Sequence, residues 1–361
     1  MGITVEQANE TLKRVIDPNT GKDLVSTRSA RNVRVEGNDV SVDVELGYPA
    51  ASQIDGIRRA VTDALKAAGA ASVSANVTMK IVAHTVQRGL KVMPNVKNII
   101  AVASGKGGVG KSTVAANLAL ALSAEGARVG VLDADIYGPS QPTMLGISGK
   151  PGSTDGRTLE PMENHGLQMS SIGLLIDADQ PMVLLAAMVT QALQQLLSQT
   201  NWKDLDYLVV VMPPGTGDIQ LTLAQQVPVT GAVIVTTPQD IALMDAKKGL
   251  KMFEKVGIPI LGIVENMAVH VCSNCGHAEH IFGAEGGVKM AKEYGVDYLG
   301  SLPLDIRIRE QADAGRPTVV ADPAGAITAT YKDIARKVAV RIAEKAKDMT
   351  LKMPNIKVSN T

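Results

Sequence analysis

An eight-residue segment rich in glycine constrains the fold of this chain more than any other feature. Residues 105–112 read Gly-Lys-Gly-Gly-Val-Gly-Lys-Ser, which matches the phosphate-loop pattern G-x-x-x-x-G-K-[ST]. The β-branched run Ile99–Ala103 precedes the segment, and the alanine-rich stretch Ser112–Ser123 follows it. The pattern therefore lies between an expected strand and an expected helix, which is the context that a phosphate-binding loop requires.

The residue types in this Walker A segment suit a nucleoside triphosphate bound with magnesium. Glycines let the backbone curl so that its amides point at phosphate oxygens, and the start of the following helix adds positive potential. Lys111 can reach the β- and γ-phosphates, and Ser112 can place its hydroxyl on Mg²⁺. The alternative is a glycine-rich turn that binds nothing. We predict an ATP site formed by Gly105, Lys106, Gly107, Gly108, Val109, Gly110, Lys111, Ser112 and Thr113.

From Asn98 onward, short β-branched runs alternate with longer helical stretches. Continuous apolar strands separated by helices predict a mostly parallel sheet covered by helices on both faces, so the expected fold class is α/β, a P-loop NTPase. The expected strands are Ile99–Ala103, Val129–Leu132, Tyr207–Val211, Val233–Thr236 and Ile258–Val264, and the expected helices are Ser112–Ser123, Met188–Ser198, Asp245–Lys255 and Thr328–Lys347.

The first 88 residues are expected to form a small α+β domain of their own. Apolar and polar residues alternate around 40–46 and 73–81, as in half-buried strands, whereas Val5–Ile16 and residues 54–65 suit helices. A length of 361 residues is comfortable for two domains. The predicted limits are 1–88 for the α+β domain, 89–97 for a linker, 98–347 for the P-loop domain and 348–361 for a loose tail.

Two carboxylates follow the expected strand Val129–Leu132 in the sequence Asp133-Ala134-Asp135. Residues at the carboxyl end of a parallel strand face the crevice where ligands bind. One carboxylate can hold a Mg²⁺-bound water, and the other can orient an attacking water. Alternatively, the pair serves only to cap the next turn, which is a common use of Asp.

The strand Tyr207–Val211 ends in a residue that does not suit nucleotide hydrolysis. In a P-loop NTPase an aspartate at this position holds Mg²⁺ through water, but position 211 is valine, which cannot accept a hydrogen bond. Asp218 lies well beyond the following loop, and Asp206 lies at the other end of the strand. We therefore predict that ATP binds and that its hydrolysis is weak.

The chain has two cysteines, Cys272 and Cys275, in one C-x-x-C motif. Two thiolates are half of the usual four-thiolate set of an iron–sulfur cluster, and a symmetric dimer supplies the other half if the pair lies near the two-fold axis. A zinc site completed by His277 and His280 fits the spacing equally well. A redox dithiol and a pair of ordinary surface cysteines are the remaining interpretations.

The composition excludes several other classes of function. Basic and acidic residues number 36 each, so the formal net charge is zero and offers no bulk attraction to nucleic acid or to anionic membranes. No apolar stretch approaches the roughly 20 residues that span a bilayer, and Met1–Glu10 lacks the features of a signal peptide. The expected location is the cytoplasm, without nucleic-acid or membrane partners.

Taken together, these motifs resemble those of the Mrp/ApbC family of iron–sulfur cluster carriers. Its members are deviant Walker A ATPases of the same broad class as MinD and the nitrogenase iron protein. Residues 1–88 resemble the MIP18-type domain often fused ahead of that ATPase. The resemblance covers nearly all of residues 98–345. The matching segments are Gly105–Thr113, Asp133–Ser140, Met212–Asp218, Thr237–Asp240, Val264–Met267 and the cysteine pair.

The resemblance implies a role for each of these residues. Lys106 would reach across a homodimer interface to the partner's nucleotide, Asp135 would position the attacking water, and Asp133 would support the magnesium shell. Asn266 would contact adenine. Cys272 and Cys275 of two subunits would share a 4Fe-4S cluster, with ATP-linked assembly and transfer to apo iron–sulfur client proteins.

Two departures from the family pattern concern turnover. Val211 replaces the expected aspartate, and residues 184–187, Leu-Leu-Ala-Ala, stand where the family has Trp-Arg-Gly-Pro. The binding motifs are intact, so the resemblance favours a carrier that binds ATP, and it leaves ATP hydrolase activity open. The alternatives are a zinc-stabilised nucleotide-binding module and a partitioning-type ATPase switch. The latter would need a membrane-binding tail or a basic DNA-binding face, and residues 349–361 carry only scattered lysines.

Overall fold

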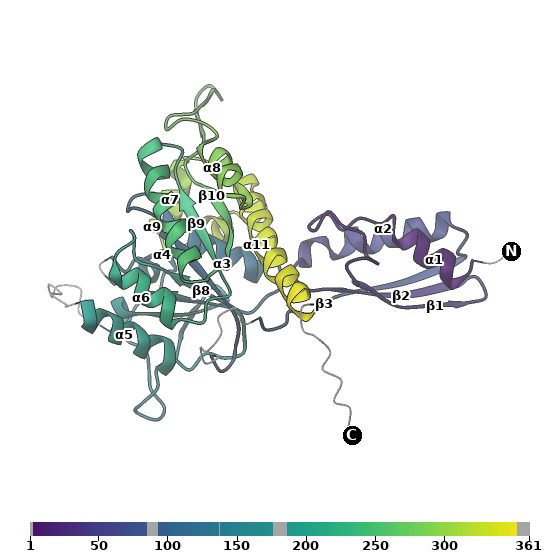
Figure 1. The fold of residues 1–361 in the computed structure, drawn as a ribbon, viewed down its shortest axis with the longest axis horizontal. Coiled ribbons are helices and arrows are strands. Elements are labelled where there is room, and N and C mark those ends of the chain that lie inside the picture. The colour runs from purple at the N-terminus through teal and green to yellow at the C-terminus, as the bar shows by residue number, and fades with distance from the viewer. Residues whose placement is uncertain (1–2, 85–92, 137, 176–185, 352–361) are drawn as a thin grey trace, which may run out of the picture. The chain divides into compact units, whose positions relative to one another are not determined.

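The computed structural model describes residues 3–84, 93–136, 138–175 and 186–351. The chain divides into two compact units (Figure 1). Unit 1 comprises Met1–Val82 together with Ala339–Thr361, and unit 2 comprises Ala83–Val338. Each unit is described by itself below. Within the described residues, no helix is both long and apolar enough to cross a membrane.

The N-terminal part of unit 1 is a three-stranded sheet with two helices. Helix α1 (Val5–Leu12) begins with a capping box between Thr4 and Gln7. Strands β1 and β2 form an antiparallel hairpin, and β2 pairs in parallel with β3 after the crossover helix α2. The bounds are β1 Ala30–Glu36, β2 Asp39–Leu46, α2 Ile54–Ala67 and β3 Ser72–Met79.

The alternating pattern explains why β2 forms. Its alternate residues Val40, Val42, Val44 and Leu46 are buried, as a strand with one covered face requires. The expected strands and helices of this region are therefore present, although α1 ends at Leu12, earlier than expected. Strand β1 was not predicted, because a bulge between Arg31 and Arg34 breaks its alternation.

Unit 2 is built on an eight-stranded sheet in the order β13-β10-β9-β4-β8-β5-β7-β6. Every pair is parallel except β6 with β7. The predicted fold class is confirmed. The strand bounds are β4 Val96–Ala103, β5 Val129–Asp133, β6 Met162–Asn164, β7 Leu167–Ser171, β8 Leu205–Val211, β9 Gly231–Thr236, β10 Ile260–Glu265 and β13 Tyr298–Ser301.

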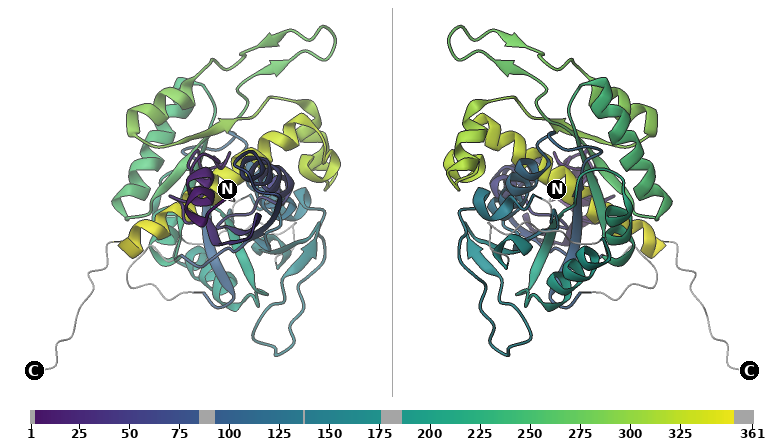
Figure 2. Two further views of the ribbon diagram at one scale, coloured as in Figure 1. Left: turned by 90° about the vertical axis from the view of Figure 1, so that its right-hand side faces the viewer. Right: turned by 90° about the vertical axis from the view of Figure 1, so that its left-hand side faces the viewer.

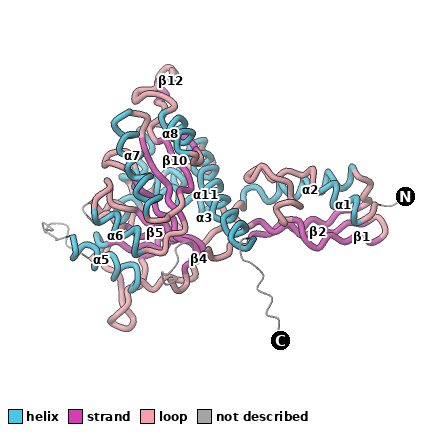
Figure 3. The backbone as a smooth tube through the Cα atoms, viewed as in Figure 1, coloured by secondary structure: helices cyan, strands magenta, loops and turns pink. Residues whose placement is uncertain are grey.

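Helices cover both faces of this sheet (Figures 2 and 3). The core cluster on one face contains Leu208 and Val210 of β8 and Met212 just after it, together with side chains of α5, α6, α7 and α8. Residues 207, 209 and 211 therefore face the other side, where α3 contacts β5 and β8. The helix bounds are α3 Lys111–Ala124, α4 Gln141–Met144, α5 Ala186–Gln199, α6 Asp218–Gln226, α7 Asp240–Lys255, α8 Gly286–Tyr294, α9 Ile306–Asp313, α10 Thr318–Ala321 and α11 Ala326–Leu351.

The expected elements of the P-loop region are all present, with ends shifted by a few residues. Strands β6, β7 and β13 and helices α4, α6, α8, α9 and α10 were not predicted, since each is short or carries polar residues within its apolar pattern. Helix α11 continues to Leu351, four residues into the segment expected to be a loose tail. Residues 352–361 lie outside the described residues. So do Leu184 and Leu185, which belong to the aliphatic segment that differs from the family pattern.

An aspartate at the start of β8 joins two strands and provides a test of stability. Oδ1 of Asp206 lies 2.7 Å from Nζ of Lys97, and its Oδ2 accepts the backbone N–H of Arg128 at 2.9 Å. Burial alone would raise the pKa of Asp206, but hydrogen bonds from Arg128 and Lys97 lower it below its usual value. This residue is thus structural and does not replace the missing carboxylate at position 211.

We expect Asp206→Asn to lower the free energy of unfolding by about 2 kcal/mol at pH 7, because a charge-assisted hydrogen-bond set is lost. The folded-state pKa of Asp206 lies below the unfolded value of about 3.9. Its stabilisation is therefore present above that value and is lost as the pH falls through the folded pKa. Urea unfolding at several pH values measures both effects. The matched control is Asp204→Asn, because Asp204 also contacts Arg128 but its side chain is 67% exposed. An equal loss in both variants would contradict the prediction.

Candidate nucleotide site and cysteine hairpin

The phosphate loop connects β4 to α3 at the carboxyl edge of the large sheet. Gly108 and Gly110 have φ angles of 83° and 81°, in the left-handed region that favours glycine. A Cβ atom on Gly110 would overlap Nδ2 of Asn266, and one on Gly105 would overlap the backbone of Asp245 in α7. The hydroxyl of Ser104 donates to the carbonyl oxygen of Lys106 at 2.9 Å. Glycine is therefore required by conformation and by close packing.

Lys111 of the phosphate loop is paired with a carboxylate. Nζ of Lys111 lies 3.2 Å from Oδ2 of Asp135, and both side chains are buried, with 6% and 12% exposed. An ammonium group in such a place needs a counter-ion, and Asp135 provides it here. Lys111, expected to bind phosphate, and Asp135, expected to position water, are therefore in direct contact. Phosphate oxygens bound to the loop would compete with Asp135 for the ammonium group of Lys111.

Asp133 is fully buried at the end of β5. Its Oδ1 accepts the backbone N–H of Asp135 at 3.2 Å, and its Oδ2 accepts the backbone N–H of Gln141 at 3.0 Å. Burial raises the pKa of Asp133 to about 6, although these two hydrogen bonds oppose the shift. The turn-capping interpretation therefore describes part of what Asp133 does, and its place beside the loop is compatible with the predicted magnesium role.

Val211 closes β8 in register with two residues of the site. It pairs with Val102 of β4 and with Asp133 of β5, and it is fully buried. Paired residues of neighbouring parallel strands share one face of the sheet, so Val211 and Asp133 lie side by side on the α3 face. This is the position at which the sequence pattern of a P-loop NTPase predicts a metal-supporting aspartate, and the side chain there is aliphatic.

The segment after β8 is tied to the strand that precedes the phosphate loop. The N–H of Met212 donates to the carbonyl oxygen of Val102 at 3.0 Å, and that of Gly215 donates to Ser104 at 3.1 Å. The segment 212–217 therefore runs alongside the end of β4 and the start of the phosphate loop. Asp218 begins α6 beyond this segment.

Asn266 lies against the phosphate loop. Its Nδ2 donates to the carbonyl oxygen of Val109 at 2.9 Å, and its backbone N–H donates to Thr236 at 2.8 Å. The side chain thus fixes the loop from the end of β10, a role that the sequence did not predict. The expected contact with adenine remains a prediction.

The cysteine pair lies outside this cluster, on a hairpin that begins five residues after β10. Strands β11 (His270–Val271) and β12 (Ala278–Glu279) pair antiparallel, and the motif forms the connection between them. The N–H of Cys272 donates to His277, and the N–H of Gly276 donates back to Cys272, both at 2.9 Å. The hairpin projects from the body of unit 2 (Figures 2 and 3).

Both thiols are accessible on this hairpin. Cys272 is half-buried, Cys275 is exposed, and neither forms a disulfide. Residues 273–281 are all exposed. The backbone N–H groups of Cys275 and Asn274 lower the pKa of the Cys272 thiol, which favours the thiolate that binds metal. A pair of accessible thiols, one of them with a lowered pKa, suits a metal group that is later released.

The histidines near the motif support the hairpin. Nδ1 of His280 donates to the carbonyl oxygen of Ala268 at 2.7 Å, and Nδ1 of His270 donates to Leu304 at 3.0 Å. Among the described residues, no group of three or more His, Cys, Asp or Glu side chains is placed to hold a metal ion. The zinc interpretation therefore lacks a full ligand set within the described part of one chain.

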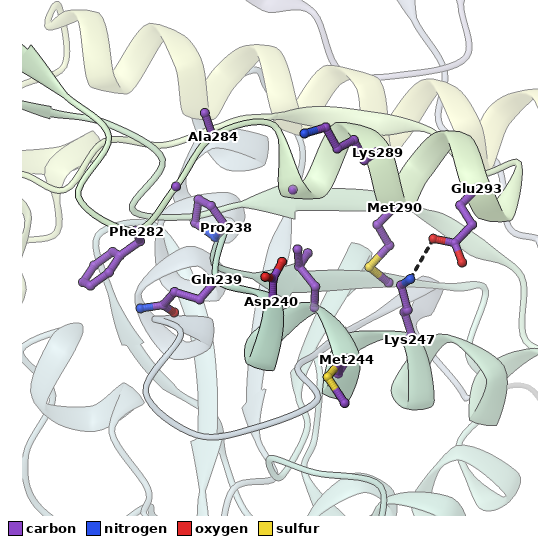
Figure 4. Close-up of a pocket in the computed structure, with 13 residues that line it drawn as sticks. Pro238, Gln239, Asp240, Met244, Lys247, Phe282, Ala284, Lys289, Met290 and Glu293 are labelled. Carbon is purple, nitrogen blue, oxygen red and sulfur yellow. Dashed lines mark hydrogen bonds and ion pairs between the residues drawn. The ribbon is translucent and has the colours of Figure 1, made fainter.

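A separate hollow lies between α7 and α8 (Figure 4). Lys247 of α7 and Glu293 of α8 point toward one another across it, with Nζ and Oε2 2.7 Å apart. Phe282, which follows the cysteine hairpin, lies at its other end. Within the described part of the chain, no residue of the phosphate loop lines this hollow. The hollow is therefore distinct from the predicted nucleotide site.

The parallel sheet, the strand–loop–helix phosphate loop and the carboxylates at the carboxyl edge together define a P-loop NTPase. A family model described as "NUBPL iron-transfer P-loop NTPase" matches residues 95–339, more than half of the chain. The chain belongs to this family. A second model, described as "Iron-sulfur cluster assembly protein", matches residues 6–78. The family resemblance predicted from the sequence is confirmed.

Individual relatives extend this finding. An "Iron-sulfur cluster carrier protein" of Pseudomonas fragi is 60% identical over 269 residues, which cover 74% of this chain and 94% of the relative. A protein of the same description from Haemophilus influenzae is 49% identical over 345 residues, which cover 94% of this chain and 93% of the relative. The structure of a nucleotide-binding protein from Archaeoglobus fulgidus in complex with ADP is also similar, with a TM-score of 0.56, 37% identity, and coverage of 64% of this chain and 90% of that chain.

Proposed function

We propose that this protein is an ATP-binding carrier that holds a 4Fe-4S cluster between two copies of the chain and transfers it to apo iron–sulfur proteins. The observation that carries the proposal is the exposed hairpin, which presents two thiols in an intact C-x-x-C motif without a fuller ligand set among the described residues. Two such hairpins supply the four thiolates of a cubane cluster. The descriptions of the Pseudomonas and Haemophilus relatives point to the same cargo.

The nucleotide site of the proposed carrier is the phosphate loop. Backbone amides of Gly105–Gly110 and the ammonium of Lys111 would bind the phosphates of ATP, and Lys106 would act across the dimer. Ser112 and Asp133 would hold Mg²⁺, which neutralises charge on the phosphates when bound. The buried carboxylate of Asp133, at the end of β5, fits such an ion.

Nucleotide state would reach the cysteine hairpin through Asn266. This residue hydrogen-bonds the phosphate loop and lies six positions before Cys272. Asp135 would orient the attacking water once phosphate has displaced the Asp135 carboxylate from Lys111.

The proposed carrier has an α+β domain at residues 1–88 and a P-loop domain at residues 98–347. Its proposed location is the reducing cytoplasm, which suits free thiolates.

Anaerobic reconstitution with iron and sulfide tests the carrier function. We expect about four iron atoms per dimer, a broad absorption band of sulfur-to-iron charge transfer, and a dimer by light scattering. Transfer to an apo 4Fe-4S protein should follow on mixing. Tightly bound zinc in a monomer that takes up no iron would instead support the zinc-stabilised nucleotide-binding module.

We expect Val211→Asp to raise ATP hydrolysis at least about tenfold, because it restores a carboxylate for a metal-bound water beside the phosphate loop. The same change should destabilise the nucleotide-free protein, since two buried carboxylates would lie side by side at positions 133 and 211. Phosphate release from Mg·ATP measures the first effect, and thermal unfolding with and without Mg·ADP measures the second.

The matched control for this experiment is Val211→Asn, which has the shape of aspartate without its charge. It should leave hydrolysis within about twofold of the unsubstituted protein, because an amide polarises water far less than a carboxylate. Equal rates in the unsubstituted protein and the Val211→Asp variant would show that position 211 does not limit turnover.

A further inference from the structure

The first residue of α4 links the two parts of the proposed magnesium site. Gln141 is fully buried. Its backbone N–H donates to Oδ2 of Asp133 at 3.0 Å, and its Nε2 donates to the carbonyl oxygen of Ser112 at 3.0 Å. Gln141 therefore joins the carboxylate at the end of β5, through its backbone, to the first turn of the phosphate-loop helix, through its side chain.

The remaining polar atom of the Gln141 side chain has no partner among the described residues. Its Oε1 is buried without a hydrogen bond. The orientation of the amide is fixed chemically, because the Ser112 carbonyl can only accept, and exchanging Oε1 with Nε2 would bring two acceptors together. A buried acceptor left without a donor is unfavourable. Such an atom beside a phosphate loop is suited to accept a hydrogen bond from an ordered, polarised water.

The neighbouring positions leave room for a further acceptor. Val211 has no side-chain acceptor, and each carboxylate oxygen of Asp133, its partner in register, already accepts one backbone N–H and keeps only its remaining lone pair for a metal-bound water. We propose that the Oε1 atom of Gln141 accepts a hydrogen bond from a Mg²⁺-bound water and so replaces part of the function that a carboxylate at position 211 would have. This inference rests on the proposed nucleotide site.

The chemistry of the amide also fits the predicted weak turnover. A neutral oxygen accepts a hydrogen bond and can hold a hydrated cation in place, but it carries less charge than a carboxylate. It would therefore support binding of the magnesium–nucleotide complex more than it supports hydrolysis. Gln141 is a positioning residue in this proposal, because it acts through water.

The test compares ADP affinities of the full chain by calorimetry, in Mg²⁺ and in EDTA. The ratio of the two affinities reports the contribution of magnesium, and an effect of the substitution on the loop itself cancels in it. We expect Gln141→Met, which keeps the length and removes the acceptor, to reduce this ratio about five- to tenfold. If that variant does not fold, Gln141→Asn, whose oxygen is withdrawn by one methylene, carries the same expectation.

The matched control is Gln311→Met on α9. Gln311 also has a buried side-chain oxygen without a partner among the described residues, but it does not contact Ser112 or Asp133 in any hydrogen bond of the described chain. Its substitution should leave the magnesium ratio unchanged. A loss equal to that of Gln141→Met would overturn the inference.

A double-mutant cycle with Val211→Asp tests replacement directly. In the Val211→Asp background the new carboxylate takes the water, so Gln141→Met should change the magnesium ratio by less than about twofold. The same loss in both backgrounds, or equal losses with Mg²⁺ and EDTA, would overturn the inference and leave the nucleotide site standing. Failure of the unsubstituted protein to bind ADP would instead overturn the proposed nucleotide site and this inference together.

Discussion

Replacing Cys272 and Cys275 together with serine is expected to abolish cluster binding, from about four iron atoms per dimer to less than about half an atom. The two thiols lie on an exposed hairpin, and the described residues around them offer no ligand set that could substitute. Iron and sulfide analysis after anaerobic reconstitution measures the loss. Because the hairpin is exposed and its serine variant keeps the backbone hydrogen bonds, the thermal midpoint should change by less than about 2 °C.

The control for the cysteine experiment is His277→Ala. Its imidazole should not be needed if thiolates from two chains complete the site, so iron content should stay within about 20% of the unsubstituted value. A large loss of metal on this change would favour the zinc interpretation. Iron retained by the double serine variant would refute the cysteine assignment altogether.

Lys111→Met is expected to weaken ATP binding by at least about a hundredfold, since a charge-assisted contact to phosphate is worth roughly 1.5–3 kcal/mol and the ammonium can make more than one. Isothermal titration with Mg·ATP measures this affinity. The change also leaves the buried Asp135 carboxylate without its ammonium partner, so some loss of stability should accompany the loss of affinity.

Asp135→Asn separates these two effects. It keeps the shape of the carboxyl group and removes the anion that competes with phosphate for Lys111. We therefore expect ATP to bind as tightly as before or more tightly, and the residual hydrolysis to fall, because the proposed water-positioning group is lost. Weaker ATP binding in this variant would show that the Lys111–Asp135 ion pair organises the site and does not compete with the nucleotide.

Most of the large sheet was predictable because its strands are fully buried. The runs at β4, β5, β8, β9 and β10 are continuous and aliphatic, and longer helical segments separate them, so both the strands and their parallel arrangement follow from local pattern. Strand β6 was missed because its three residues give too little periodicity. Strand β7 was missed because Gln168, Ser170 and Ser171 interrupt its apolar run. Strand β1 was missed because its bulge interrupts the alternation.

The chemistry of the site was predictable where it depends on residue type within one segment. The phosphate loop, the two carboxylates Asp133 and Asp135 and the cysteine pair are each local motifs. The contacts of Gln141 and Asn266 were not predictable, because they join residues 29 and 157 positions apart. No local pattern specifies which side chain will meet a given backbone carbonyl across such separations.

The sequence by itself determined the fold class, the family, the loop that curls around phosphate and the absence of a carboxylate at position 211. These properties depend on backbone conformation, burial and side-chain chemistry, which short segments specify. The tertiary structure alone decided that Lys111 is paired with Asp135, that Asp133 has both oxygens engaged, and that a buried amide oxygen lies beside Ser112. These arrangements arise only when separate strands meet at one edge of the sheet, because there the packing brings together groups that are distant in the chain.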